Sequence, residues 1–399
     1  MSSKFKKARQ KAFKAFKSPT IKIGFSNIDT WVDMGNFAMN RIMSGKFKEG
    51  LLFGRNYVYY GESGSGKSLQ AAYACANAQR DHGAFVLWID VEKATDDQAG
   101  RKWLGRVGVD ISDDNFEYAA AATLGDVKKI ISDMCQIYRD AYTDDNDSFK
   151  QPMVIVVDSW SATMTESQWK QALEGEVKGD QGQKAKQTGD VVQATTHLAS
   201  HLPVLVIGIG HIMDSQEEYG PRHKTTGGHK MFYMASGCMM FTKKELKTDD
   251  KNTKIEDDEV RKYYEDMKKG MPATMTKRKQ VIGHVCVVDN LKSRASKPFQ
   301  RIEIQVPFNT GMDPYSGLMD LLIYEGAITV SSASWYQFGP ADNPTKFQRS
   351  GFRKVADDAM AWADQLNPNG IMEQISAEEA QAEYDAAIAE EEEDGGTEE

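Results

Sequence analysis

The chain lacks the features of a membrane or secreted protein. Its 399 residues contain no apolar run of 18 or more, so no transmembrane helix is expected. The N-terminus has no apolar segment of the secretory kind; its basic, acid-free start would suit an organelle transit peptide, although those are usually rich in serine. The four cysteines are far apart and form no Cys-x-x-Cys motif. We therefore expect reduced, mostly buried thiols in a cytoplasmic protein.

An excess of positive charge is also missing. The formal net charge is −9, which argues against nucleic-acid binding through bulk positive charge. The charge is concentrated at the two ends, because residues 1–17 contain seven bases and no acid, whereas residues 373–399 contain twelve acids and no base. The part between them is close to neutral, so the overall charge does not decide whether a local site binds DNA.

Composition divides the chain into four parts. Phe5, Ala8, Ala12 and Phe16 have near-helical spacing among lysines, which predicts a short basic amphipathic helix. The acidic end is of low complexity, and such segments are disordered. We predict a basic N-terminal arm, a core that contains a charged insertion, a small helical region and a disordered acidic tail: residues 1–20, 21–340 (insertion 248–280), 341–372 and 373–399.

The core has the pattern of an α/β fold. Near-continuous Val/Ile runs occur at 153–158 and 203–208, and they alternate with helical patterns at 68–80 and 127–138. Strands of this kind form parallel sheets that are covered on both faces. The predicted fold class is therefore α/β, with a mostly parallel central sheet flanked by helices.

An octapeptide between an apolar strand and a helix has the phosphate-binding pattern G-x-x-x-x-G-K-[ST]. Its glycines let backbone N–H groups point at phosphates, and the helix N-terminus adds positive charge. The lysine would reach the β- and γ-phosphates, and the final serine hydroxyl would ligate Mg²⁺. We predict that ATP and Mg²⁺ are bound here, by Gly61, Glu62, Ser63, Gly64, Ser65, Gly66, Lys67 and Ser68.

Two carboxylates at strand ends complete the predicted site. Asp158 closes the strand 153–158 and, with Ser68, is the candidate for the Mg²⁺ shell. Hydrolysis also needs a group that orients or deprotonates water. Asp90 and Glu92 end the strand that follows the phosphate-loop helix. Glu92 is favoured because alternation gives both carboxylates the same facing and glutamate reaches further.

Beyond the phosphate loop, further segments form a recognisable set. They are Ile89-Asp90-Val91-Glu92, Glu174-Gly175-Glu176, Thr225-Thr226-Gly227-Gly228, Lys292-Ser293-Arg294, and Asp313-Pro314-Tyr315-Ser316-Gly317-Leu318 followed by Trp335-Tyr336. Together they resemble the RecA recombinase family, closest to its bacteriophage UvsX type, over residues 29–338. The resemblance implies a RecA-like P-loop ATPase core.

The resemblance implies catalytic roles for residues that match the family's motifs. Glu92 takes the place of the catalytic glutamate, and His211 that of the γ-phosphate sensor, which is histidine in UvsX-like members. Lys292 and Arg294 match a pair of cations that reach the neighbouring subunit's ATP. In-trans cations of this kind stabilise charge on the transferred phosphoryl group, so ATP binding becomes coupled to polymerisation. With Lys67, these are the predicted catalytic residues.

Two polar stretches, 175–189 and 212–230, resemble the family's DNA-binding loops. Their cations and backbone N–H groups would contact DNA phosphates. The predicted DNA-binding residues are Lys178, Lys184, Lys186, Arg222, Lys224, Gly227 and Gly228. The implied partners are single-stranded and double-stranded DNA and further copies of the chain in a filament. Single-strand-binding and loader proteins are candidate partners, and no membrane partner is expected.

Each end of the chain has two interpretations. Phe5-Lys6-Lys7-Ala8 resembles the Phe-x-x-Ala segment with which some family members dock onto the next protomer, whereas a basic amphipathic helix also suits DNA or a membrane surface. The acidic tail either aids solubility or competes with DNA for basic surface.

The predicted function is a DNA-dependent ATPase that forms filaments on single-stranded DNA and exchanges strands with a homologous duplex. It would act in the cytoplasm, which is the host's if the chain is phage-encoded. One alternative is a hexameric RecA-fold helicase. Another is a RecA-like paralogue that binds DNA or modulates filaments and hydrolyses ATP poorly. DNA-stimulated turnover and the shape of the assembly distinguish the three.

Overall fold

The computed structural model of the chain describes residues 28–141, 151–176, 182–200, 202–214, 223–225, 228–247, 258–269, 281–332 and 334–368. The predicted N-terminal arm and the predicted acidic tail lie outside these residues, as does most of the insertion 248–280. No helix in the described ranges is both long enough and apolar enough to cross a membrane.

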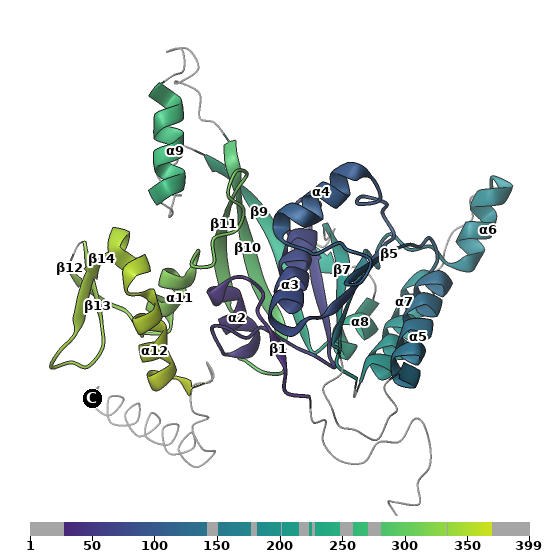
Figure 1. The fold of residues 1–399 in the computed structure, drawn as a ribbon, viewed down its shortest axis with the longest axis horizontal. Coiled ribbons are helices and arrows are strands. Elements are labelled where there is room, and N and C mark those ends of the chain that lie inside the picture. Colours follow the sequence, from purple (N-terminus) through teal and green to yellow (C-terminus); the bar gives the residue numbers. More distant parts are fainter. Residues whose placement is uncertain are drawn as a thin grey trace, which may run out of the picture.

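A large, mostly parallel sheet forms the centre of the molecule (Figure 1). Its strand order is β11-β10-β9-β3-β7-β6-β4-β5, and β8 pairs with β7. The strands from β9 to β5 along this order run parallel, whereas β10, β11 and β8 are antiparallel to their neighbours. Their bounds are β3 Asn56–Gly61, β4 Phe85–Asp90, β5 Phe116–Ala120, β6 Met153–Asp158, β7 Val204–Asp214, β8 His223–Thr225, β9 Gly237–Lys247, β10 Val281–Ser293 and β11 Arg301–Pro307.

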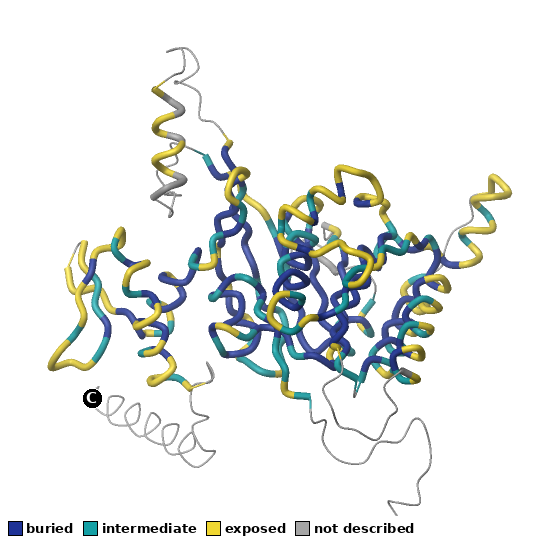
Figure 2. Tube along the Cα trace, viewed as in Figure 1, coloured by how far each residue is buried: buried dark blue, intermediate teal, exposed yellow. Residues whose placement is uncertain are grey.

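Helices cover both faces of this sheet, which is why its central strands are apolar on both sides (Figure 2). One face packs against α2 (Phe37–Ser44), α3 (Lys67–His82) and α4 (Gln98–Val107). The other packs against α5 (Leu124–Ala141), α7 (Gln183–Ala199) and α8 (Gly228–Met234). The predicted α/β class with a mostly parallel, helix-flanked sheet is confirmed.

Smaller elements surround the central layers. β1 (Trp31–Val32) and β2 (Leu51–Leu52) form a two-stranded sheet. Helix α6 (Glu166–Glu174) has no buried residue. Helix α6 and helix α9 (Asp258–Lys269) of the charged insertion both extend away from the sheet (Figures 1 and 2).

Two stretches expected to be polar loops are partly regular. Helix α7 begins at Gln183, inside the predicted loop 175–189, and β7 continues to Asp214 instead of ending near residue 208. The first two turns of α7 have only Thr188 and Gly189 buried, so they lack the apolar stripe by which a helix is recognised. The extension of β7 is paired with β8.

A third hydrophobic cluster lies apart from the two faces of the sheet. It draws on α11 (Leu318–Tyr324), the three-stranded sheet β12 (Thr329–Ser332), β13 (Trp335–Phe338) and β14 (Thr345–Gln348), the 3₁₀ helix η1 (Arg349–Lys354) and α12 (Ala356–Leu366). Its members come from both sides of residue 340, so residues 318–363 pack as one C-terminal unit, and Phe47, which follows α2, packs into the same cluster.

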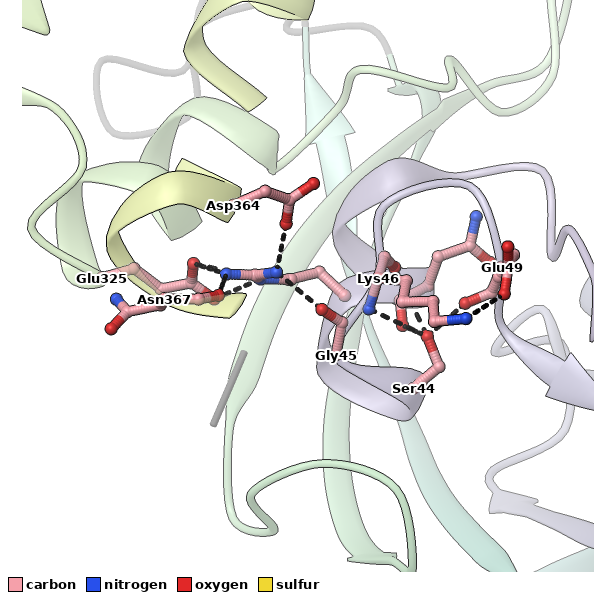
Figure 3. Close-up of polar contacts among 9 residues, drawn as sticks. Ser44, Gly45, Lys46, Glu49, Glu325, Asp364 and Asn367 are labelled. Carbon is pink, nitrogen blue, oxygen red and sulfur yellow. Dashed lines mark hydrogen bonds and ion pairs between the residues drawn. The ribbon is translucent and has the colours of Figure 1, made fainter. Parts of the chain in front are cut away.

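Arg41 of α2 joins this C-terminal unit to the core. Its partners Gly45, Glu325, Asp364 and Asn367 are labelled in Figure 3. Its side chain is fully buried and forms an ion pair with Glu325 at 3.1 Å and with Asp364 at 2.8 Å. It also donates to the carbonyls of Gly45 and Asn367, at 2.6 and 3.0 Å. Since a buried guanidinium is costly unless its donors are satisfied, these four partners explain how it is tolerated.

Candidate active site

The predicted nucleotide-binding residues, with Glu92 and His211, converge at one edge of the sheet, at the carboxyl ends of the adjacent strands β3, β7, β6 and β4. Gly61, the first residue of the phosphate loop, is the register partner of His211 on β7. Asp90 at the end of β4 is the partner of Asp158 at the end of β6. Open parallel sheets bind ligands at the carboxyl ends of their strands, and here those ends carry the phosphate loop and the side chains of Glu92, Asp158 and His211.

The phosphate loop leaves β3 and enters α3 with the backbone that its glycines allow. Gly64 and Gly66 have φ of 69° and 99°, in the region that favours glycine. A Cβ at Gly61 would lie 2.2 Å from the carbonyl oxygen of Phe241, so β9 approaches too closely for any side chain there. Helix α3 begins at Lys67, so its free N–H groups face the loop.

Lys67 is held inside this loop. Its side chain is buried and its Nζ donates to the carbonyl of Glu62 at 2.6 Å. Burial lowers the pKa of Lys67, and the nearby carboxylates of Asp158 and Glu92 oppose that shift. A buried ammonium that donates to a carbonyl is suited to exchange that partner for a phosphate oxygen.

Asp158 and Ser68 offer the chemistry that a Mg²⁺–nucleotide needs. Burial raises the pKa of Asp158 to about 6, and a hydrogen bond with Ser68 opposes the shift. The described residues contain no group of three His, Cys, Asp or Glu side chains that could hold a metal alone. Mg²⁺ is usually bound through one or two protein oxygens together with substrate phosphates and water. A hydroxyl and a carboxylate beside a phosphate loop form such a donor set.

Glu92 lies with His211 and Ser159 at the mouth of the site. Its Oε1 accepts from Ser159 Oγ at 2.5 Å and lies 2.8 Å from His211 Nε2. The hydrogen bond with His211 is the main reason that the pKa of Glu92 falls to about 2, and Ser159 adds to it. The side chains of Glu92 and His211 are each 33% exposed, so both reach solvent at this edge.

Buried hydrogen bonds between Asp90 and Thr95 set the position of the segment that carries Glu92. Asp90, 1% exposed, accepts at Oδ2 from the backbone N–H of Thr95 and from its hydroxyl, both at 2.8 Å. Between them Lys93 has φ of 55°, a rare conformation for a residue with a side chain. The hydrogen bonds from Thr95 to Asp90 therefore join the two ends of the segment that contains Glu92, whereas the side chain of Glu92 faces the open site. The two carboxylates were expected to face alike, but β4 ends at Asp90 and alternation does not extend to Glu92.

The low pKa of Glu92 predicts a pH-dependent contribution to stability. The folded-state pKa, about 2, lies below the ordinary value of 4.5. The stabilisation is therefore complete above pH 4.5 and is lost as the pH falls toward 2. Relative to Glu92→Gln, the wild type is expected to lose about 1 kcal/mol of unfolding free energy at most, because the carboxylate is partly exposed. Urea unfolding between pH 6 and 3 measures this, and a difference that does not change with pH would contradict it.

The packing around His211 explains why the residue before it is a glycine, Gly210. The His211 N–H donates to Ser161 Oγ at 2.7 Å, which anchors the strand beside the segment that follows β6. A Cβ at Gly210 would lie 2.9 Å from the ring of Tyr60, which is buried against this strand. Packing against Tyr60 therefore leaves no room for a side chain at position 210.

Lys292 and Arg294 lie away from this edge of the sheet. Lys292 pairs in register with Cys238, which in turn pairs with Val58 near the start of β3. Its Nζ donates to the carbonyls of Phe232 and Tyr233, both at 2.9 Å. Arg294 is exposed, and its N–H bonds Ser236, which bonds Asn56. At 3.3 Å per residue, β3 runs about 10 Å from Val58, the level of Lys292, to Gly61 of the phosphate loop. From Asn56, the level of Arg294, it runs about 17 Å.

The structure describes some of the predicted DNA-binding residues. Lys184 and Lys186 are on the first turns of α7, where Lys184 Nζ donates to the carbonyl of Ser161 at 2.7 Å and Lys186 is exposed. Gly228 begins α8 with φ of 77°. The backbone of Lys224 belongs to β8. Lys178, Arg222 and Gly227 lie outside the described residues.

Two groups at the site were not predicted from the sequence. Lys243 of β9 and Cys286 of β10 donate to carbonyls of the phosphate loop. No motif marks them, because they contact the loop only through pairing of strands that are distant in sequence.

The sequence of the chain is similar to those of several RecA proteins. No protein-family model matches the chain. The protein RecA of Acidothermus cellulolyticus is 28% identical over 292 residues, covering 72% of this chain and 69% of that protein. That of Blastochloris viridis is 26% identical over 349 residues, covering 85% of each. That of Salinispora tropica is 26% identical over 292 residues, with the same coverage as the first. These similarities support the RecA family for this chain.

Proposed function

We propose that the chain is an ATP-dependent DNA recombinase of the bacteriophage UvsX type, which assembles on single-stranded DNA and exchanges strands with a homologous duplex. The observation that carries the proposal is the contact of Glu92 with His211 beside a phosphate loop, on a mostly parallel sheet flanked by helices. The similarity to RecA proteins supports the general activity. The UvsX type rests on the sequence segments near residues 313–336.

The site residues divide the work of ATP hydrolysis. Lys67 and the loop N–H groups would bind the phosphates, while Ser68 and Asp158 would hold Mg²⁺, which neutralises charge on the phosphate oxygens. Glu92 would orient the attacking water and accept its proton.

The contact between Glu92 and His211 provides a link to the nucleotide. While His211 is bound to Glu92, it keeps the pKa of that carboxyl near 2, so the carboxylate is a weak base. When His211 turns to a γ-phosphate, Glu92 loses this partner and its pKa returns toward 4.5. Nucleotide binding would in this way make the general base stronger.

Completion of the site would require a second copy of the chain. Lys292 and Arg294 do not contact their own phosphate loop, so any charge they supply to a nucleotide goes to another protomer. DNA would bind through Lys184, Lys186 and the backbone of Gly228, together with Lys178, Arg222, Lys224 and Gly227. Contacts of this kind are insensitive to sequence and weaken with salt.

ATP turnover with and without single-stranded DNA, read beside negative-stain images, tests the proposal. We expect DNA to stimulate turnover, and we expect open filaments on DNA in the presence of ATP. Closed six-membered rings would support a helicase instead. Turnover indifferent to DNA would contradict the recombinase function.

A further inference from the structure

The phosphate loop is contacted from outside by the hairpin of β9 and β10. Lys243 and Cys286 are register partners across these two strands, and both point at the loop. Lys243 Nζ donates to the carbonyl of Ser63 at 2.7 Å, and Cys286 Sγ donates to that of Ser65 at 3.2 Å. Burial raises the pKa of Cys286 to about 12, so it is a thiol and a donor.

These carbonyls belong to the same loop as the N–H groups that would receive a phosphate. In a loop whose N–H groups converge on an anion, successive carbonyls must turn outward. An outward carbonyl needs a donor, or the peptide can turn back and remove its N–H from the cradle. The hairpin supplies such donors at Ser63 and Ser65. Inside the loop, Lys67 and the hydroxyl of Ser65 satisfy the carbonyl of Glu62 in the same way.

Lys243 also brings a second ammonium to the phosphate site. A Cβ at Gly64 would lie only 3.1 Å from its Nζ, so the charge is over the tip of the loop. After burial and the opposing carboxylates, the charge of Lys243 further lowers the pKa of Lys67. The pKa of His284 is also lowered, mainly by burial and in addition by the charge of Lys243. Both shifts report a field that would attract an anion.

We propose that Lys243 is a positioning residue of the nucleotide site, which holds the tip of the phosphate loop in its phosphate-binding form and adds positive charge for the ATP phosphates. The inference rests on the proposed function, because it assumes that the loop binds ATP. Lys243 acts through the loop and is not itself assigned a step of hydrolysis. Loss of its ammonium should therefore weaken nucleotide binding and leave turnover at saturation almost unchanged.

The next residue in the chain is a matched control. Lys244 has the same side chain but points to the opposite face of the sheet, where its Nζ pairs with Glu303 at 2.5 Å. Both lysines are exposed, so replacing either should leave the fold intact. Lys244→Met thus removes the same charge from the same strand without touching the loop.

The test measures the Kd of a fluorescent ATP analogue with Mg²⁺, and the KM and kcat of ATP hydrolysis, for the full chain. Lys243→Met is expected to raise Kd and KM roughly tenfold, the effect of losing a hydrogen bond from a charged donor, with kcat within about twofold. Lys243→Arg should restore most of the affinity. Lys243→Gln keeps a donor but no charge, and its deficit should shrink as salt is raised. Lys244→Met should match the wild type.

The outcomes separate the two levels of inference. If Lys243→Met binds the analogue as tightly as the wild type, or loses no more affinity than Lys244→Met, the role of Lys243 is wrong and the nucleotide site stands. If the wild type fails to bind the analogue and Lys67→Ala behaves identically, the proposed function and this inference both fall. A Lys243→Met deficit found equally in kcat, or one that Lys243→Arg does not restore, would also overturn the positioning role.

Discussion

Glu92→Gln is expected to lower the kcat of ATP hydrolysis roughly 10²–10⁴-fold, the range that a positioned general base contributes. The amide keeps the size of the side chain and can still contact Ser159 and His211, so the site should remain assembled. It cannot accept a proton from water. Nucleotide binding should stay within about threefold of the wild type, because the lost function belongs to the transition state.

Single-turnover hydrolysis with saturating single-stranded DNA measures this effect without the contribution of product release. Glu117→Gln is the matched control, since Glu117 is an exposed residue of β5 outside the site. Retention of more than a tenth of the wild-type rate by Glu92→Gln would show that another group activates water. Loss of nucleotide binding in the same variant would instead indicate that Glu92 holds the site together.

Arg41→Met is expected to lower the free energy of unfolding by about 3–5 kcal/mol, the usual cost of breaking a buried ion pair from one side. The side chain of Glu325 is only 8% exposed, so its carboxylate would lose its buried counter-ion. Asp364 is 52% exposed and can turn to water, so it should contribute little to the loss. The C-terminal unit, defined by residues 318–363, should become the first part of the structure to open.

Urea unfolding and hydrogen exchange would measure the global and the local effect of this change. Arg349→Met provides the comparison, because Arg349 pairs with Asp320 in the same unit but at an exposed site, where such pairs contribute at most about 1 kcal/mol. Adding Glu325→Gln to Arg41→Met should recover part of the lost stability by removing the unpaired charge. Equal losses for Arg41→Met and Arg349→Met would contradict the role given to burial.

The sequence carried most of the fold because the central strands are buried on both faces. A continuous apolar run such as 153–158 predicts a strand without any alternation of polar and apolar residues, and the structure places β6 at those residues. The phosphate loop was equally accessible, since its glycines and its lysine have fixed spacing between strand and helix. Elements whose side chains face solvent lack an apolar pattern in the sequence. The start of α7 is one of these, so it was predicted as part of a polar loop.

Contacts between distant segments could not be predicted from the sequence. Lys243 belongs to a mixed apolar and charged stretch, and only its register with Cys286 brings it to the phosphate loop. Arg41 looks like a surface residue of a short helix until α12 is packed against it. Glu92 was favoured from its place after β4, whereas the prediction for His211 depended on a family resemblance. No local rule states that these two residues, 119 positions apart, will meet.

The separation of Lys292 and Arg294 from the phosphate loop has a numerical consequence under the proposed function. Each copy would give its cations at one end of β3 and receive those of a neighbour at the other. A single copy then contains no complete site, and a row of n copies with free ends contains n − 1. Turnover per copy should therefore climb with the length of the row and approach a plateau, so that short rows are disproportionately idle.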